Sequence, residues 1–294
     1  MSRPARAVAV TGASGFVGRA LCTHLVARGI ETRPLVRDPT AFSLAGAAPA
    51  ARCDLPDVLD EASLAGAHAV VHCAYATREP DQARARRVNE DGTRRLLDAS
   101  RRAGVPSFVF VSTVAAYADA PSYYARSKFE LEGLLDLDRD AIVRPGLIIG
   151  RGGHGLFQQL LDNMRRLHVV PLFGGGQQPV QTVHLDDLCE AIARVLERDL
   201  HGDFNVAEPI PVTFREFLTA MAARSRTRCV FLPLPARPVL AAVRAIESMH
   251  LPFPLRSESI LGLQGMRAVD TANDLRRLGV RARSAGESLT DVFS

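Results

Sequence analysis

The sequence predicts an α/β protein with a doubly wound parallel sheet and a smaller C-terminal lobe. Short apolar segments alternate with helical patterns from residue 7 to residue 145, an order that places helices on both faces of parallel strands. A glycine-rich turn joins the first apolar segment directly to the first helical pattern. Beyond Gly150, glycines and prolines divide the chain into shorter elements. We expect residues 1–150 to form the sheet domain, residues 180–206 to return to it, and residues 151–294 to form mainly the lobe.

The composition is that of a globular protein with room for one large domain or two unequal ones. Of its 294 residues, 47% are apolar and 23% are charged. No apolar run approaches the roughly 18 residues that cross a bilayer, so we expect no membrane partner. The segment from Met1 to Arg6 is too short and too polar for a signal peptide. Five cysteines without C-x-x-C spacing indicate reduced thiols, and a cytoplasmic location is expected.

The charged residues give little sign of a nucleic-acid or metal partner. The net charge is +4, but the arginines are scattered among acids, and the chain has no Trp and few Tyr. A basic balance suits an anionic small molecule equally well. His68 and His72 would share a strand face, but no nearby residues complete a ligand set. We therefore expect a small-molecule substrate, no nucleic acid and no metal.

The first strand, Ala7–Val10, leads straight into a glycine turn and then a helix that ends near Gly29. Glycines let backbone N–H groups approach a pyrophosphate, and the helix N-terminus adds its partial positive charge. A strand, a glycine turn and a helix in this order form the context that a dinucleotide fingerprint requires. The residues expected at the pyrophosphate are Gly12, Gly15, Phe16, Val17 and Gly18.

The end of the second strand, Thr32–Val36, bears on the choice of cofactor. Dinucleotide folds place an acid here to bind the ribose 2′-hydroxyl, but this position is Arg37, and Arg33 lies on the same strand face. A guanidinium suits a 2′-phosphate, whereas Asp38 could still bind the ribose of NAD. We expect NADP, with NAD as the alternative.

The next two strands bring further candidates to the same edge of the sheet. The third strand ends at Cys53-Asp54-Leu55, where Asp54 would lie near the adenine amino group or would cap the acidic segment that follows. The fourth strand, Ala69–Cys73, is followed by a turn of small residues that begins at Ala74. A long helix is expected over Asp81–Ala103.

The fifth strand, Phe108–Val111, is almost wholly apolar, as expected for a strand with both faces covered. Ser112 and Thr113 follow at its C-terminal end, and ligand crevices lie at these ends in open α/β sheets. A sixth strand is expected at Ala141–Arg144 and a returning helix at Leu185–Leu196.

Tyr124 and Lys128 lie four residues apart and therefore on one face of the predicted helix between these strands. Lys128 is the only lysine among the 36 basic residues, and Arg is a poor substitute for a compact ammonium. A cation beside a phenol favours the phenolate, so we expect the pair to exchange a proton nearer to neutral pH.

An apolar stripe occurs on a predicted helix of the lobe. It is expected to be lobe core rather than a membrane or partner face. Its members are Val239, Leu240, Val243, Ile246 and Met249.

With these residues in place, the chain resembles the extended short-chain dehydrogenase/reductase family, also called the NAD-dependent epimerase/dehydratase family, over nearly its full length. That family has a Rossmann fold. The matching residues are Thr11-Gly12-x-x-Gly15-x-x-Gly18, Asp54-Leu55, Asn89 with Gly92-Thr93, Ser112-Thr113 before Tyr117, Tyr124-x-x-x-Lys128, Arg144-Pro145-Gly146 and Val183-His184-x-Asp186-Asp187.

The resemblance implies a role for each matching residue. Tyr124 would be the acid/base, Lys128 would bind the nicotinamide ribose and keep Tyr124 acidic, and Thr113 would bind the reacting oxygen. Ser112 is the neighbouring candidate for the role of Thr113. Further cofactor contacts are implied for Asp54, Leu55, Ala74, Pro145 and Ile148.

The expected function is that of an NAD(P)-dependent oxidoreductase or epimerase acting on a carbinol or carbonyl substrate. A nucleotide sugar is one candidate substrate, although Pro145-Gly146-Leu147 departs from the pattern of sugar-nucleotide members. The alternative is a non-catalytic dinucleotide-binding assembly or sensor protein that resembles an accessory subunit of respiratory complex I. A homodimer through the predicted helix of Leu131, Leu134 and Leu135 stays open.

Overall fold

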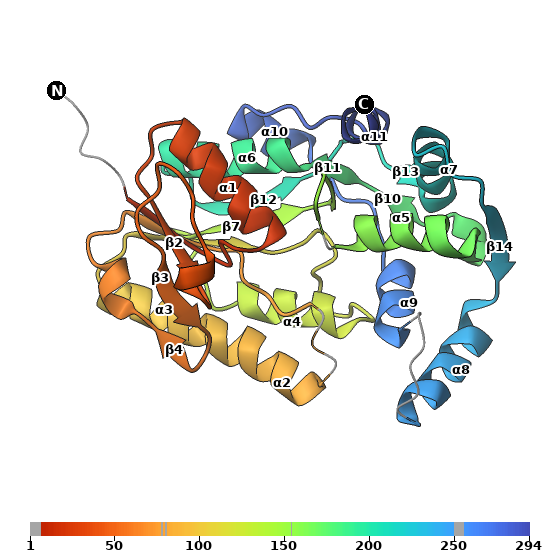
Figure 1. Cartoon of the computed structure of the whole chain (residues 1–294), viewed down its shortest axis with the longest axis horizontal. Coiled ribbons are helices and arrows are strands. Elements are labelled where there is room, and N and C mark those ends of the chain that lie inside the picture. Colours follow the sequence, from red (N-terminus) through yellow and green to blue (C-terminus); the bar gives the residue numbers. More distant parts are fainter. Residues whose placement is uncertain (1–6, 78, 80, 154, 250–255) are drawn as a thin grey trace.

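The computed structural model describes residues 7–77, 79, 81–153, 155–249 and 256–294. Its centre is an eight-stranded sheet in the order β12-β7-β6-β5-β1-β2-β3-β4 (Figure 1). The strands of this sheet are β1 (Val8–Thr11), β2 (Thr32–Val36), β3 (Ala51–Asp54), β4 (Val58–Leu59), β5 (Ala69–His72), β6 (Ser107–Val111), β7 (Ala141–Pro145) and β12 (Gly202–Val206). Neighbouring strands are parallel except β3 and β4. The doubly wound parallel sheet is confirmed.

The strand order places the candidate site. Successive crossovers run outward from β1 to β2 and β3, and the chain then returns to β5 on the other side of β1. Ligands of open α/β sheets bind at such a reversal, outside the carboxyl ends of the strands. The residues that follow β1 and β5 therefore face the same crevice.

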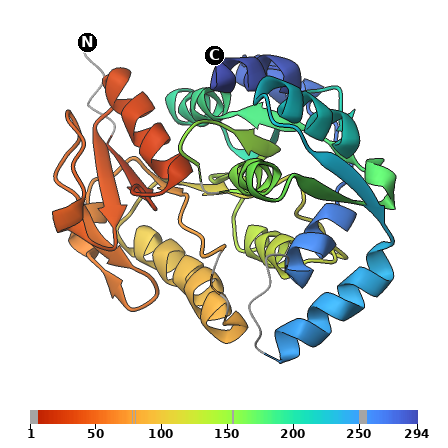
Figure 2. The same cartoon turned by 45° about the vertical axis from the view of Figure 1, so that its right-hand side comes forward.

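Helices cover both faces of the sheet (Figures 1 and 2). One face is covered by α1 (Phe16–Ala27), α6 (Leu185–Glu197) and α10 (Ala272–Leu278). The other is covered by α2 (Gln82–Arg86), α3 (Gly92–Arg102) and α4 (Tyr123–Glu132). Five residues that continue α2 into α3, Arg87–Asp91, form a π-helical turn, η3, within the long helix that the sequence predicts.

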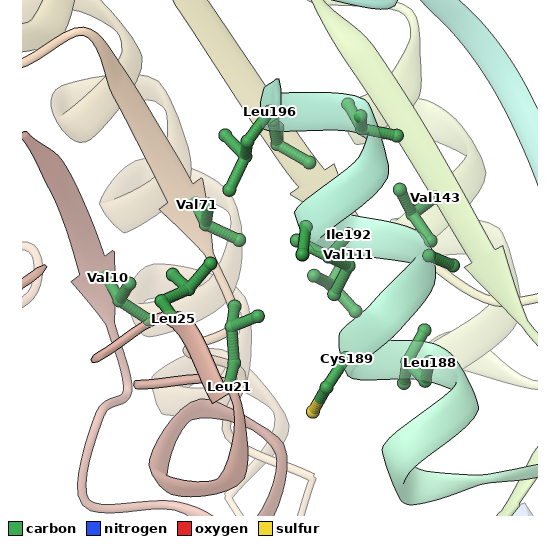
Figure 3. Packing of buried hydrophobic residues seen from close by; sticks show 14 of the residues in the cluster. Val10, Leu21, Leu25, Val71, Val111, Val143, Leu188, Cys189, Ile192 and Leu196 are labelled. Atoms are coloured by element: carbon green, nitrogen blue, oxygen red, sulfur yellow. The ribbon is translucent and has the colours of Figure 1, made fainter. Parts of the chain in front are cut away.

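The core between the sheet and the first layer explains why these elements form. Leu21 and Leu25 of α1 and Leu188 and Ile192 of α6 are fully buried against the strands (Figure 3). Burying a leucine or isoleucine side chain contributes roughly 1.5–3 kcal/mol, so this layer is a main source of stability. Val10, Val71, Val111 and Val143 supply the strand side of the contact.

The lobe has its own buried core, centred on Phe157, Met164, Phe214 and Phe217. Its two-stranded sheets pair β8 with β11, β9 with β14 and β10 with β13. Its elements, with the strands that join it to the sheet domain, are β8 (Leu147–Ile149), α5 (Leu156–Leu167), β9 (Val169–Phe173), β10 (Pro179–Val180), β11 (Thr182–His184), β13 (Val212–Thr213), α7 (Phe214–Arg224), β14 (Val230–Leu234), α8 (Ala236–Ser248), α9 (Ser257–Gln264) and α11 (Ala285–Phe293). The 3₁₀ helices of the chain are η1 (Pro39–Ala41), η2 (Glu61–Leu64) and η4 (Gly174–Gly176).

Two features of the C-terminal half differ from the sequence expectation. Helix α10 packs on β12 and α6 through Leu275 and Leu278, although the sequence predicts a return only for residues 180–206. A seven-residue helix is too short to show a clear apolar period. On α8, Val243 is buried in the lobe core as expected, whereas Met249 beyond its end is 59% exposed.

No helix among the described residues has the length and apolar character needed to cross a bilayer. The segment Met1 to Arg6, on which the expectation about a signal peptide rests, lies outside the described residues.

Candidate active site

In the turn after β1, glycine is needed at Gly12 and Gly18 for steric reasons, and at Gly15 it leaves the start of α1 without a side-chain cap. Gly12 has a φ of +64°, and a Cβ there would lie 2.9 Å from the Cα and N of Ala74. A Cβ on Gly18 would lie 2.2 Å from the carbonyl oxygen of Gly12. Gly15 is the N-cap of α1 and supplies no side-chain acceptor to the first-turn N–H groups. These uncapped donors fit the pyrophosphate of a dinucleotide.

The loop after β8 covers the start of α1. Cβ atoms placed on Gly150 and Gly153 would each lie 2.9 Å from Cζ of Phe16. The Phe16 ring therefore packs directly against this loop. Ala74, which follows β5, lies against Gly12, so the residue for which the resemblance implies a cofactor contact lies beside the glycine turn.

A buried histidine ties the glycine turn to the π-helical turn. The hydroxyl of Thr11 lies 2.7 Å from His72 Nδ1, and His72 Nε2 lies 2.9 Å from the hydroxyl of Thr93. Thr93 donates to the carbonyl oxygen of Asn89, and Thr11 accepts from the N–H of Ala74. The Thr93 hydroxyl must therefore accept from Nε2, and Nδ1 must accept from Thr11. Burial lowers the pKa of His72 to about 3, so the ring is neutral with its proton on Nε2.

Asn89 completes this support and was not among the predicted site residues. Its Oδ1 accepts a 2.7 Å hydrogen bond from the N–H of Ala76, and its side chain is only 2% exposed. Asn89 lies in η3, and π-helical turns often occur at functional sites. It therefore fixes the loop from Ala74 to Ala76 at the crevice.

The candidate residues in and after β2 differ in whether their side chains already bind other protein groups. Arg33 pairs with Glu31 and donates to the carbonyl oxygens of Ser63 and Ala65, so it is held away from a ribose. Asp38 accepts from the N–H and hydroxyl of Thr40, and these bonds lower the pKa of its carboxyl group. Arg37, by contrast, is exposed and makes no ion pair with any residue in the described ranges.

The predicted adenine contacts lie at the end of β3. Asp54 is exposed at the last position of the strand. Leu55 packs against the helix opposite, where a Cβ on Gly92 would lie 2.9 Å from the Leu55 Cβ. Glycine at this position lets the end of β3 approach α3 closely.

Thr113 and Tyr124 meet at the C-terminal end of β6. A hydrogen bond with the Thr113 side chain tends to lower the pKa of Tyr124, but burial has the larger effect and raises it overall. The Ser122 hydroxyl caps α4 by accepting from the N–H of Ala125, and this cap places Tyr124 in the first turn. Ser112 instead donates to Glu132 at 2.5 Å, so Thr113 is the member of the pair that contacts the phenol.

Lys128 is buried one turn after Tyr124. Its Nζ donates to the carbonyl oxygen of Val111 at 2.7 Å and lies 4.3 Å and 4.4 Å from the ring centroids of Tyr75 and Phe110. Desolvation lowers the pKa of Lys128 to about 7. From the sequence we expected Lys128 to lower the pKa of Tyr124. In the structure, burial raises this pKa and the Thr113 side chain lowers it, with burial the larger effect.

Tyr75 is a further residue of the site that the sequence did not single out. Its ring meets that of Tyr124 edge to face, with 5.4 Å between the centroids. The buried hydroxyls of Tyr75 and Ser127 have no well-formed hydrogen bond to any described residue. Buried hydroxyls without partners beside Tyr124 fit a site that receives a polar ligand.

A buried ion-pair network supports the site from behind. Arg144 on β7 binds both carboxylate oxygens of Glu132, at 2.9 Å and 2.8 Å, and also Asp203 on β12 at 2.5 Å. Ser112 donates to the same Glu132. The network joins the end of β6 to α4, β7 and β12. No local sequence pattern reveals it, because its members are far apart in the chain.

The backbone near Pro145 and Ile148 is held by neighbouring strands. The Pro145 carbonyl oxygen accepts from the N–H of Val114 at 3.0 Å, and Ile148 pairs with Val183 in the parallel β8–β11 sheet. This turn therefore adjoins the segment after Thr113, where the resemblance places the carboxamide contact.

One histidine–carboxylate cluster lies at the start of α6. The ligand atoms of His184, Asp186 and Asp291 all lie within 4.8 Å of one another. However, Arg283 Nη1 donates to His184 Nδ1 at 2.6 Å and lies 3.4 Å from Asp291 Oδ2. A guanidinium in this position opposes a metal cation, and the contacts fasten α11 to the start of α6.

Comparison with known proteins agrees with this geometry. The model of the NAD dependent epimerase/dehydratase family matches residues 8–207, which span β1 to the segment after β12. The chain belongs to this family. Members depend on NAD or NADP, so the protein is an NAD(P)-binding protein with a Rossmann fold.

Relatives within the family differ in what they do. A Stigmatella aurantiaca 4-hydroxy-2-methyl-3-oxo-4-farnesyl-3,4-dihydroquinoline-1-oxide ketoreductase is 30% identical, covering 82% of this chain and 79% of its own. Subunit 9 of the mitochondrial NADH dehydrogenase 1 alpha subcomplex of Arabidopsis thaliana is 28% identical, covering 89% of this chain and 69% of its own. Human epimerase family protein SDR39U1, solved with NADPH, has the same fold: the TM-score is 0.73 at 23% identity, covering 98% of this chain and 99% of its own.

Proposed function

We propose that the protein reduces a ketone with NADPH. The observation that carries the proposal is the placing of Tyr124 one turn before the buried Lys128 on α4, with the Tyr75 ring against Tyr124 and the Lys128 Nζ bonded to the end of β6. When bound, the dinucleotide supplies the hydride. The ketoreductase among the relatives supports this choice within a family that also contains epimerases.

We assign the cofactor contacts to protein groups that still have hydrogen-bond donors to offer. Lys128, for example, uses one of its three N–H donors for the Val111 carbonyl oxygen. The uncapped first turn of α1 and the glycines before it would hold the pyrophosphate. Arg37 would bind a 2′-phosphate, since Arg33 and Asp38 are both engaged by other protein groups. Lys128 would donate to the nicotinamide ribose. Its pKa would then rise, because a hydrogen-bonded and anionic neighbourhood favours the ammonium.

The protonation state of the Tyr124 phenol suits the reductive direction. Burial raises its pKa, so the phenol keeps its proton at neutral pH. A protonated phenol can donate to the carbonyl oxygen of a ketone as hydride arrives at the carbon. Thr113 would bind the same oxygen and hold it in line. Oxidation of an alcohol would instead need the phenolate, which is favoured only at higher pH.

The test uses a pair of adjacent tyrosines. NADPH consumption is followed with a panel of ketones for the wild type, Tyr124→Phe and Tyr123→Phe. Tyr124→Phe should lower turnover by roughly a hundredfold or more, with NADPH affinity nearly unchanged. Tyr123 donates to Glu90 and is the matched control, expected to change turnover only slightly. Equal turnover in Tyr124→Phe and the wild type would refute the acid/base assignment.

A second candidate is a dinucleotide-binding assembly protein, which the respiratory-chain relative favours. The same assay separates the two. A protein that binds NADPH but consumes it with no ketone or sugar nucleotide would support this role. An epimerase would retain its dinucleotide through purification and interconvert substrate isomers without net NADPH consumption.

A further inference from the structure

One end of the lobe carries exposed arginines in two segments of the chain that lack Asp and Glu. The segments 163–185 and 217–246 contain no Asp or Glu. The arginines of these segments are all exposed, and within the described part of the chain none forms an ion pair or a side-chain hydrogen bond. They are Arg165, Arg166, Arg224, Arg226, Arg228, Arg237 and Arg244.

The two arginine-bearing turns lie side by side. The carbonyl oxygen of His168, after α5, accepts from the N–H of Val230 at 2.8 Å. His168 Nδ1 donates to the carbonyl oxygen of Arg228 at 2.9 Å. Beyond these bonds β9 and β14 run parallel, with Val169 opposite Val230. Arginines far apart in the sequence therefore flank one strand pair.

Aliphatic side chains project between these arginines. Leu167 is 54% exposed, Val169 40%, Val230 63% and Leu232 45%. We call this surface, formed by residues 165–169 and 224–232, the β9–β14 edge. Beyond it the chain continues from β14 into α8 (Figure 1). Arg237 and Arg244 of this helix are exposed.

We propose that the β9–β14 edge docks on an anionic lipid bilayer. Arginines near such a surface are attracted by its negative potential, and their alkyl stems lie along the acyl boundary. Exposed leucines and valines gain from entering the same boundary. A single surface that offers both kinds of side chain, and whose segments 165–169 and 224–232 contain no Asp or Glu, complements a bilayer in charge and in polarity.

The same residues suit other partners less well. Binding of single-stranded nucleic acid relies on exposed aromatic rings, and the one aromatic residue of the edge, Phe231, packs against the lobe core. Protein interfaces draw most of their energy from Trp, Tyr and Arg, whereas Leu and Val are under-represented there. The nearest acid along the chain, Asp162, accepts from Gln158. From the sequence we expected no membrane partner, because it contains no long apolar run, but peripheral docking needs no such run.

The test is vesicle flotation of the purified full-length chain. Vesicles of phosphatidylcholine alone are compared with vesicles in which about one-third of the lipid is phosphatidylglycerol. The wild type should bind only the anionic vesicles and should be released by salt. R166Q/R228Q, with one arginine removed from each turn, should bind roughly 25-fold more weakly, at about fivefold per arginine.

Two further variants separate charge from apolar contact. V230T/L232T keeps the net charge and should still weaken binding several-fold. R94Q/R276Q removes two exposed arginines elsewhere, on α3 and α10, and should change binding less than about twofold. Unchanged urea midpoints confirm that the variants fold.

Several outcomes would overturn the proposal. One is that the wild type binds neither kind of vesicle. Another is that R94Q/R276Q and R166Q/R228Q lose vesicle binding equally. Binding to an oligonucleotide or to polyglutamate with the same arginine dependence, in the absence of vesicle binding, would also overturn it.

Discussion

Lys128 is a buried ammonium whose charge lowers the stability of the fold, and Lys128→Met tests this directly. The pKa of Lys128 falls from 10.5 to about 7 because burial removes its hydration. At 1.36 kcal/mol per pKa unit, retaining the charge in the folded state costs about 5 kcal/mol. Methionine has a similar length and no charge. Losing the hydrogen bond to the Val111 carbonyl costs about 1–2 kcal/mol.

The net expectation is that Lys128→Met raises the free energy of unfolding by about 3 kcal/mol at pH 6 while abolishing turnover. The effect must depend on pH. Between pH 7 and pH 10.5 the unfolded chain keeps the Lys128 proton and the folded chain does not. Wild-type stability from this group therefore rises with pH across that window, by about 1.4 kcal/mol per pH unit, and the variant lacks the rise.

Urea unfolding followed by circular dichroism at several pH values between 6 and 9.5 measures both quantities. Buried thiols keep their protons in the folded protein because burial raises their pKa values, but they lose them at about pH 8.5 once the chain unfolds. Stability therefore also falls with pH through these groups, so the informative quantity is the difference between variant and wild type. These thiols belong to Cys22, Cys53, Cys73 and Cys189. Tyr124→Phe leaves Lys128 in place and should keep the wild-type dependence between pH 6 and 9.5. A Lys128→Met protein less stable than the wild type at pH 6, or with an unchanged pH slope, would refute the reasoning.

Three other predictions concern groups around the site. Arg37→Ala should weaken NADPH binding about tenfold or more in calorimetry and leave NADH binding unchanged, and equal losses would exclude a 2′-phosphate contact. Glu132→Gln should lower the free energy of unfolding by about 2 kcal/mol, because it leaves Arg144 poorly paired. The control Glu130→Gln, at an exposed position, should change the same quantity by less than about 0.5 kcal/mol. Similar losses in the two variants would contradict the ion-pair network. Nitrogen NMR should find His72 neutral with its proton on Nε2 down to about pH 5, and an imidazolium at pH 6 would contradict the hydrogen-bond chain.

The sequence predicted the fold well because its signals are local. Apolar runs placed β2 at Thr32–Val36, and the glycine turn follows β1 as expected. The pattern of the 81–103 segment predicted one helix, but it could not show the π-helical turn that places Asn89 under the Ala74–Ala76 loop. A single extra residue in a turn does not alter the apolar period enough to be seen.

For the site, the sequence identified residues but not their contacts. Ser112 and Thr113 are equivalent candidates by position, and only the structure assigns Ser112 to Glu132 and Thr113 to Tyr124. Arg33 and Arg37 likewise share a strand face, and only the backbone around Ser63 shows that Arg33 is engaged.

By itself the sequence determined the order of strands and helices, the glycine turn, and the placing of Tyr124 and Lys128 on one helical face. These follow from backbone sterics and from side-chain periods within a few residues. Only the tertiary structure decided that Lys128 turns to the Val111 carbonyl, that burial raises the pKa of Tyr124, and that unpaired arginines gather at the β9–β14 edge. Desolvation and charge pairing depend on groups brought together from distant parts of the chain, and no local pattern encodes them.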